Sequence, residues 1–136
     1  MPAPPPTGWL DAPHSSGDWH YSATSDGGAA QYGDRGNPAQ FSVLCHRTAR
    51  TVELVRQGAV TSATPMVVRT TIRDGAVTAQ PSTGPVPSAF AVLSASDPLL
   101  DTMAFSRGRF AIEVAGLATL YLPAWPELAR VIEDCR

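Results

Sequence analysis

The 136-residue sequence contains no lysine, and all ten of its basic residues are arginines, against twelve acidic residues. The resulting net charge of −2 provides no basic surface of the kind that nucleic-acid binding requires. An all-arginine set is typical of a GC-rich genome. It is also suited to pairing with carboxylates or phosphates. The composition therefore argues against a nucleic-acid partner and leaves recognition of anions open.

Long apolar runs are also absent. No stretch approaches the ~20 consecutive apolar residues that cross a bilayer, and no apolar signal segment is present. The chain opens instead with Met1-Pro-Ala-Pro-Pro-Pro6, which resembles the spacer that follows the acylated cysteine of bacterial lipoproteins. We therefore expect an exported lipoprotein of the periplasm or outer membrane. Its membrane attachment would be only through a lipid anchor that precedes this sequence.

Cysteine is scarce as well, with only Cys45 and Cys135. A disulfide, two buried thiols and a metal-binding pair are the alternatives, and spacing alone does not decide between them. Zinc sites use ligands a few residues apart, whereas these cysteines are 90 positions apart and His46 directly follows Cys45. The spacing therefore argues against a metal site, and no cofactor is expected.

The remaining pattern predicts a mainly β protein. Residues 1–16 form a proline-rich linker, and residues 17–136 form a single β-rich domain. Period-two alternation and β-branched residues bounded by turn residues predict strands at 19–23, 29–32, 40–46, 51–56, 66–73, 77–80, 90–93, 109–114 and 119–122. These strands suit an antiparallel β-sandwich-like domain with two short helices.

Both helices have recognisable starts. Asp97 or Ser96 can cap the first helix, with Pro98 at its first position and Gly108 at its end. Its expected apolar stripe consists of Leu99, Leu100, Met103 and Phe105. Pro126 begins the second helix, whose apolar stripe is Leu128, Val131, Ile132 and Cys135.

Both cysteines are directed inward by these patterns. Cys45 continues the apolar face of its strand, which also carries Phe41 and Val43, and Cys135 lies on the apolar face of the last helix. We therefore expect a Cys45–Cys135 disulfide that links the C-terminal helix to the sheet. Such a bond persists only in an oxidising compartment, in agreement with export.

Catalytic patterns are weak. The three histidines, His14, His20 and His46, lie in the linker or on expected outward positions, and no Gly-x-Ser-x-Gly elbow or Walker loop is present. Neighbours on a strand point to opposite faces, which disfavours a Cys45–His46 thiol–imidazole pair. The aspartates fall mostly in turns and caps, where they have structural roles. We therefore expect no catalytic set.

Four arginines are candidates for an anion-binding patch. Arg69 and Arg73 are four positions apart in one expected strand and would emerge on the same face. Arg107 and Arg109 flank the junction between the first helix and the next strand. The alternative is an ordinary solvated charged surface. A functional patch would bind a carboxylate of an envelope protein, a lipid headgroup or an anionic glycan.

Two long segments carry a family resemblance. They are Asp97-Pro-Leu-Leu-Asp-Thr-Met-Ala-Phe-Ser-Arg-Gly-Arg-Phe-Ala-Ile-Glu-Val-Ala-Gly-Leu117 and Leu120-Tyr-Leu-Pro-Ala-Trp-Pro-Glu-Leu-Ala-Arg-Val-Ile-Glu-Asp-Cys-Arg136. Both resemble stretches of small uncharacterised alphaproteobacterial envelope lipoproteins. The layout is more remotely similar to invasion-associated locus B proteins and to accessory periplasmic proteins of type VI secretion, although the second cysteine pair of the former is missing. The resemblance implies an envelope location and supplies no catalytic residues.

The sequence therefore favours a non-enzymatic binding or accessory module of the cell envelope. An envelope hydrolase acting on wall or glycan, and an enzyme inhibitor, remain as alternatives. Two convergent carboxylates or a Ser–His pair in a pocket would favour the hydrolase, and a rigid protruding loop would favour the inhibitor. The segment 81–87, with three prolines, is a candidate for such a loop.

Overall fold

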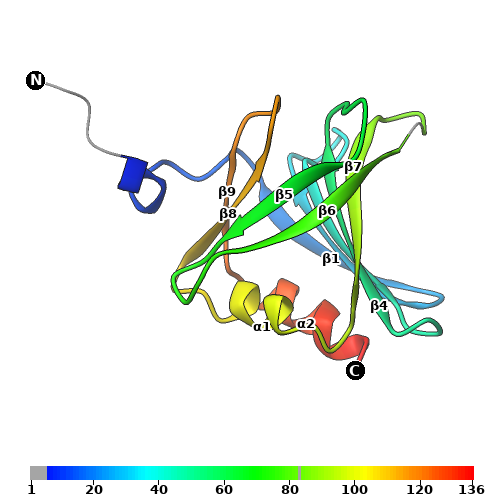
Figure 1. The fold of residues 1–136 in the computed structure, drawn as a ribbon. Helices are drawn as coiled ribbons and strands as arrows, with labels where there is room; N and C mark the ends of the chain where they lie inside the picture. Colours follow the sequence, from blue (N-terminus) through cyan, green and yellow to red (C-terminus); the bar gives the residue numbers. More distant parts are fainter. Residues whose placement is uncertain (1–5, 83) are drawn as a thin grey trace, which may run out of the picture.

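The computed structural model describes residues 6–82 and 84–136. Within them, a short 3-10 helix η1 (Pro6–Leu10) precedes a mainly antiparallel β fold (Figure 1). The strands are β1 (Asp18–Thr24), β2 (Gly27–Gly33), β3 (Phe41–His46), β4 (Thr51–Gln57), β5 (Thr64–Arg69), β6 (Gly75–Ser82), β7 (Ser88–Ser94), β8 (Arg109–Val114) and β9 (Leu120–Pro123). The helices are α1 (Pro98–Ala104) and α2 (Pro126–Asp134). The expected fold class is confirmed.

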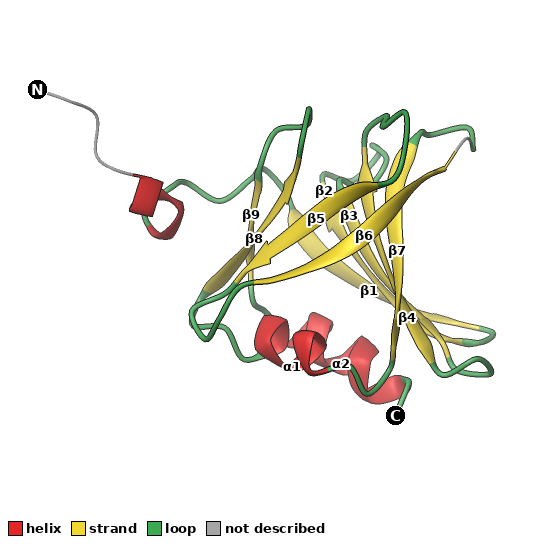
Figure 2. Cartoon of the chain, in the orientation of Figure 1, coloured by secondary structure: helices red, strands yellow, loops and turns green. Residues whose placement is uncertain are grey.

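One continuous sheet runs in the order β1-β2-β3-β4-β7-β6-β5-β8-β9. Strand β6 changes partner along its length: Gly75–Ala79 pair with β5, and Gln80–Ser82 pair with β7. A strand that switches partners makes a corner in a sheet. The sheet therefore curls back so that its halves face each other, which is the sandwich-like arrangement. Both helices lie across one end of it (Figures 1 and 2).

The two ends of the sheet meet through the core. The ring of Trp19 on β1 lies 5.2 Å from that of Tyr32 and 6.4 Å from that of Phe110 on β8, measured between ring centroids. The indole nitrogen of Trp19 donates a hydrogen bond to the carbonyl oxygen of Pro123 on β9, at 2.7 Å. A buried Trp therefore satisfies its polar atom while joining the first strand to the last.

The segment expected as a linker also contacts the sheet. The backbone nitrogen of Ser15 donates to the carbonyl oxygen of Tyr121 at 2.9 Å, and the nitrogen of Tyr121 donates to the hydroxyl of Ser15 at 3.0 Å. The hydroxyl of Tyr32 donates to the carbonyl oxygen of Ser15 at 2.7 Å. Residues just before β1 therefore bond to β9 beside the first strand.

The first helix is shorter than its apolar pattern suggested. The side chain of Asp97 accepts a hydrogen bond from the nitrogen of Leu99 at 2.9 Å, which is the expected N-cap. Leu100 and Met103 are fully buried. Phe105 was expected on the same stripe, and that expectation is wrong. The helix ends at Ala104, and Phe105 leaves its axis with 69% of its surface exposed.

The disulfide is present as expected. Cys45 at the end of β3 and Cys135 just after α2 are bonded, with their Cα atoms 5.5 Å apart. Gly27 packs directly against the bond, since a Cβ atom at this position would lie 2.5 Å from the sulfur of Cys45. Its φ of +135° is also one that other residues rarely adopt. The C-terminal helix is thereby fixed to β3, with β2 close beside the link.

Strand β5 ends four residues earlier than predicted. The hydroxyl of Thr70 accepts hydrogen bonds from the nitrogens of Ile72, at 3.2 Å, and Arg73, at 3.0 Å, and donates to the carbonyl of Arg73 at 2.6 Å. A threonine that bonds its own following backbone competes with the strand ladder and forms a turn. Arg73 therefore lies in a loop, so it does not share a strand face with Arg69.

Candidate functional site

Arg69 is engaged by two carboxylates. Its guanidinium forms a two-pronged ion pair with Glu113 on the neighbouring strand β8, and its Nη1 lies 2.9 Å from the carboxylate of Asp74. The hydrogen bond with Glu113 is the main cause of a raised pKa of Arg69. The positive charge of Arg69 is thus already balanced by two carboxylates within the fold.

Arg109 is engaged by backbone. Its Nη1 donates to the carbonyl oxygens of Trp9, at 3.2 Å, and of Ala12. These contacts attach the N-terminal segment to the start of β8. Of the four candidate arginines, Arg69 and Arg109 therefore make internal contacts, and Arg73 and Arg107 remain exposed.

Arg73 and Arg107 lie on two adjoining loops. The first loop, residues 70–74, joins β5 to β6, and the second, residues 105–108, joins α1 to β8. The backbone nitrogen of Arg107 donates to the hydroxyl of Thr71 at 2.7 Å, and the nitrogen of Thr71 donates to the hydroxyl of Ser106 at 3.0 Å. These reciprocal bonds hold the two loops together.

The base of this loop pair is buried and hydrogen-bonded. Thr70 and Ser106 are each only 5% exposed. The hydroxyl of Ser106 also donates to the carbonyl oxygen of Arg109 at 2.5 Å, while Gly108, with φ of +76°, turns the chain into β8. Buried, satisfied hydroxyls fix loop geometry more firmly than solvated ones do. The two loops therefore form one rigid unit.

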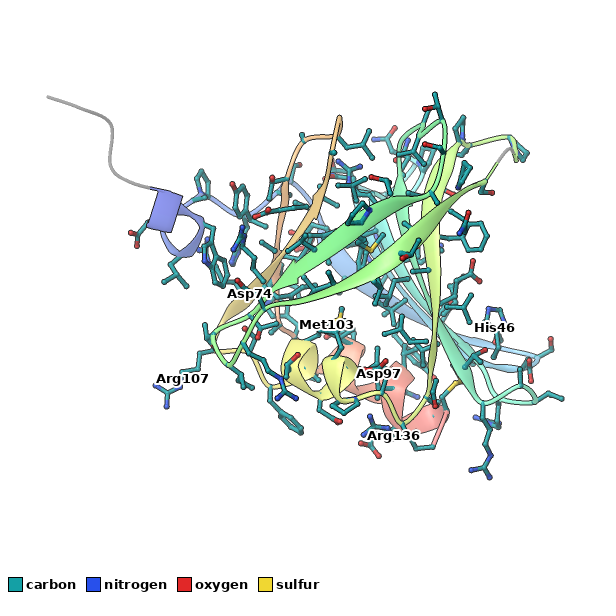
Figure 3. The ribbon with its side chains drawn as sticks, viewed as in Figure 1. His46, Asp74, Asp97, Met103, Arg107 and Arg136 are labelled. Atoms are coloured by element: carbon teal, nitrogen blue, oxygen red, sulfur yellow. A yellow bond between two sulfur atoms is a disulfide. The ribbon has the colours of Figure 1, made fainter. Side chains whose placement is uncertain are left out.

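Large apolar side chains project from this unit. Ile72 is 55% exposed and Phe105 is 69% exposed, and exposed Arg73 and Arg107 flank them in sequence. We call these four residues the tip. Neither tip arginine forms an ion pair within the part of the chain that the structure describes. The loops project at one corner of the helix end of the sheet (Figure 2), and Arg107 points away from the body (Figure 3).

Trp125 lies next to the tip along the backbone. The nitrogen of Ala124 donates to the carbonyl of Gly108 at 3.1 Å, so the start of α2 adjoins the second loop. The side chain of Trp125 is 40% exposed and forms no side-chain cap on α2.

Arg56 on β4 is a buried arginine outside the four candidates. It is only 8% exposed, and burial lowers its pKa. Its guanidinium donates to the carbonyl oxygens of Gln57 and, at 2.7 Å, Ala118, and its Nε has no partner among the described residues. Arg56 thus bridges β4 to the loop between β8 and β9 without a carboxylate.

Other chemistry-bearing groups are dispersed. His46 faces away from Cys45 and lies 2.9 Å from the carboxylate of Glu53. Because Cys45 is in the disulfide, it is not a free thiol. Within residues 6–82 and 84–136, no group of three or more His, Cys, Asp or Glu side chains could hold a metal ion.

Four hollows of about 250–300 Å³ lie elsewhere on the surface, and none of the four is lined by a tip residue. One of them brings His20 near Asp34 and Arg35 on the β2–β3 side. In the candidate inhibitor segment 81–87, Pro81 and Ser82 belong to β6, and residue 83 lies outside the described residues.

Comparison with known proteins finds no family model, no curated protein and no solved structure that matches this chain. No helix in the described residues has the length and apolar character needed to span a membrane. The candidate site therefore depends on the geometry of this chain alone. The tip combines hydrogen-bonded loops, exposed apolar side chains and two arginines that form no ion pair among the described residues.

Proposed function

We propose that this protein is a non-enzymatic binding module of the cell envelope and that the tip is its binding surface. The observation that carries the proposal is the exposure of Ile72 and Phe105 on loops that hydrogen bonds hold rigid. The hydrogen bonds between Thr71, Ser106 and Arg107 bring together the two loops that carry these side chains, and exposed apolar side chains on one surface mark interaction sites. Rigid loops lose little conformational entropy on binding.

The disulfide supports the compartment. A bond between Cys45 and Cys135 persists in oxidising surroundings and is rare where thiols are kept reduced. An exported, envelope-located protein has such surroundings. Location in the periplasm or at the outer membrane, as a lipoprotein, is therefore part of the proposal.

The tip supports binding energetically. Burying the exposed parts of Ile72 and Phe105 against a partner would contribute about 1–2 kcal/mol for each side chain. Arg73 and Arg107 would add charge complementarity to an anionic partner. The arginines that are paired internally, Arg69 and Arg109, would instead hold the loops and the N-terminal segment in place.

The test is sedimentation of the purified full chain with isolated envelope fractions. A double variant, Ile72→Ser with Phe105→Ser, is expected to lose most of the bound fraction. The matched control is Val92→Ser, because Val92 is also 55% exposed but lies on the outer face of β7. Equal binding by the tip variant and the control, with both folded, would contradict the proposal.

An enzyme inhibitor is the second candidate, since the tip is a rigid projection of the kind that can enter an active-site cleft. The full chain would be assayed against wall-degrading muramidases and peptidases. Inhibition that disappears in the Ile72→Ser, Phe105→Ser variant would support this candidate. Unchanged hydrolysis at saturating protein would remove it for the enzymes tested.

A further inference from the structure

We propose that the tip binds the surface of an anionic phospholipid membrane, with Ile72 and Phe105 entering the interface and Arg73 and Arg107 contacting lipid phosphates. This inference rests on the proposed function, because it names the partner of the same surface. It adds a direct contact between the folded domain and the bilayer.

The shape of the site is the first argument. A peptide or small molecule is bound in a concave site, where most of its surface is enclosed. The tip instead projects from a corner of the fold, with Arg107 directed away from the body (Figure 3), and it lines none of the four hollows described above. A projection with apolar side chains at its end can insert into a fluid lipid interface without a matching cavity.

The side-chain composition is the second argument. Interfacial segments combine aromatic and aliphatic side chains with arginine, whose long stem lets the charged group reach the phosphates. Phe105 and Ile72 supply the apolar part, and Arg107 and Arg73 lie one or two positions away along the two loops. Trp125 is 40% exposed and follows Ala124, whose nitrogen donates to the carbonyl of Gly108 in the second loop, and Trp is enriched at membrane interfaces.

Charge is the third argument. The chain carries a net charge of −2, yet no carboxylate pairs with either tip arginine within the described residues. The nearby carboxylates of Asp74 and Glu113 are instead occupied by Arg69. The loops therefore present local positive charge on a protein that anionic lipid would otherwise repel.

The fixed loop geometry is the fourth argument. The bonds between Thr71, Ser106 and Arg107 hold both loops without any partner. The backbone positions of Ile72 and Phe105 are therefore held relative to each other before any membrane is bound. A membrane-binding surface needs this, because each side chain alone buries little area, and the two must enter the interface at once to hold the domain there.

The experiment is co-sedimentation of the full chain with vesicles of equal parts phosphatidylglycerol and phosphatidylcholine, and with vesicles of phosphatidylcholine alone. Binding is expected to the first and to be weak to the second, and to fall as salt is raised. Removing both positive charges by Arg73→Gln with Arg107→Gln should weaken binding about thirtyfold. The matched control is Arg35→Gln with Arg50→Gln, two exposed arginines outside the tip.

Insertion is tested separately. Ile72→Ser with Phe105→Ser should reduce vesicle binding to background, whereas Val92→Ser should not. In Phe105→Trp, the added fluorescence should be quenched by lipids brominated on their acyl chains, and in Val92→Trp it should not. Circular dichroism and unchanged midpoints of thermal unfolding confirm that each variant is folded.

The outcomes separate the two proposals. Vesicle binding that depends on the tip supports both. Tip-dependent binding to envelope fractions without binding to protein-free vesicles overturns the lipid inference, leaves the proposed function standing and indicates a protein or glycan partner. Vesicle binding that the Arg35, Arg50 control loses as strongly as the tip variant also overturns the inference, because it shows nonspecific attraction.

Discussion

Removing the disulfide is expected to lower the free energy of unfolding by about 3–5 kcal/mol. The change is Cys45→Ala with Cys135→Ala, which deletes a bond across a sequence separation of 90 residues. In the chain-entropy description, closing a loop of that length in the unfolded chain contributes about 4.5 kcal/mol at 25 °C. Measured values are often smaller than this figure, which sets the lower end of the range.

The folded state should survive the change. Helix α2 has nine residues, too few to be stable alone in water. It nevertheless keeps Leu128, Val131 and Ile132 buried against the sheet, and the carboxylate of Asp134 accepts a hydrogen bond from the hydroxyl of Tyr21 at 2.5 Å. We therefore expect a folded variant with faster amide hydrogen exchange in α2.

The assay is urea unfolding followed by tryptophan fluorescence, on the oxidised protein, the same protein under reductant and the double alanine variant. Trp19 is buried at the centre of the fold and reports global unfolding. Reduced wild type and variant should agree within about 1 kcal/mol, since both lack the same constraint. An unchanged midpoint on reduction, or two alkylatable thiols in protein isolated from its native compartment, would refute this reasoning.

Three further predictions follow from single residues. Gly27→Ala should destabilise the fold by about 2–4 kcal/mol, because the added Cβ would clash with the sulfur of Cys45 and because φ at this position is positive. The control Gly84→Ala, which has open space around it, should change stability by less than about 0.5 kcal/mol. Urea unfolding of both variants measures the difference. Arg56→Met should leave stability within about 1 kcal/mol of wild type or raise it, because burying a guanidinium without a carboxylate costs desolvation energy. A loss above about 3 kcal/mol in the same assay would contradict this and show that the hydrogen bonds of Arg56 to carbonyl oxygens are net stabilising. Hydrogen bonds from Thr48 lower the pKa of Asp26 below its ordinary value of 3.8. The carboxylate of Asp26 therefore contributes its full stabilisation above that value and loses it as the pH falls through the folded-state pKa. Asp26→Asn should show a shallower loss of stability on acidification below pH ~4, and identical pH profiles of variant and wild type would contradict this.

Local patterns predicted the secondary structure well, because it depends on neighbours in the chain. The alternation in Phe41–Cys45 and the Asp97 cap correspond to β3 and to the start of α1. The early end of β5 was missed because a strand-like run of β-branched residues includes Thr70, whose hydroxyl bonds its own loop. No periodicity distinguishes that threonine from one within a strand.

The order of strands lay beyond such patterns. Pairing of β4 with β7 and of β5 with β8 joins segments distant in sequence, and it depends on the switch of β6 from one partner to another. The disulfide is the exception among the long-range contacts, because the chain has only two cysteines and the local patterns direct both of them inward. Their pairing was predicted from direction alone.

The candidate site was predicted only in part. Arg73 and Arg107 were identified, but Arg69 and Arg109 have internal partners that the sequence did not reveal. Ile72 and Phe105 were read as apolar residues of a strand and a helix. Their positions give one signal of exposure, because Ile72 directly precedes Arg73 and Phe105 directly precedes Ser106, so each lies where an apolar pattern gives way to polar residues.

The place of the disulfide in the chain has a consequence for how the molecule matures. All the strands of the described chain precede Cys135, so a polypeptide delivered N-terminus first exposes the thiol of Cys45 long before its partner emerges. During that interval the thiol is open to exchange with other thiols and disulfides. In the folded domain the two Cα atoms lie 5.5 Å apart, because α2 is docked on the sheet beside β3. The native bond can therefore close only after the last segment of the chain has emerged.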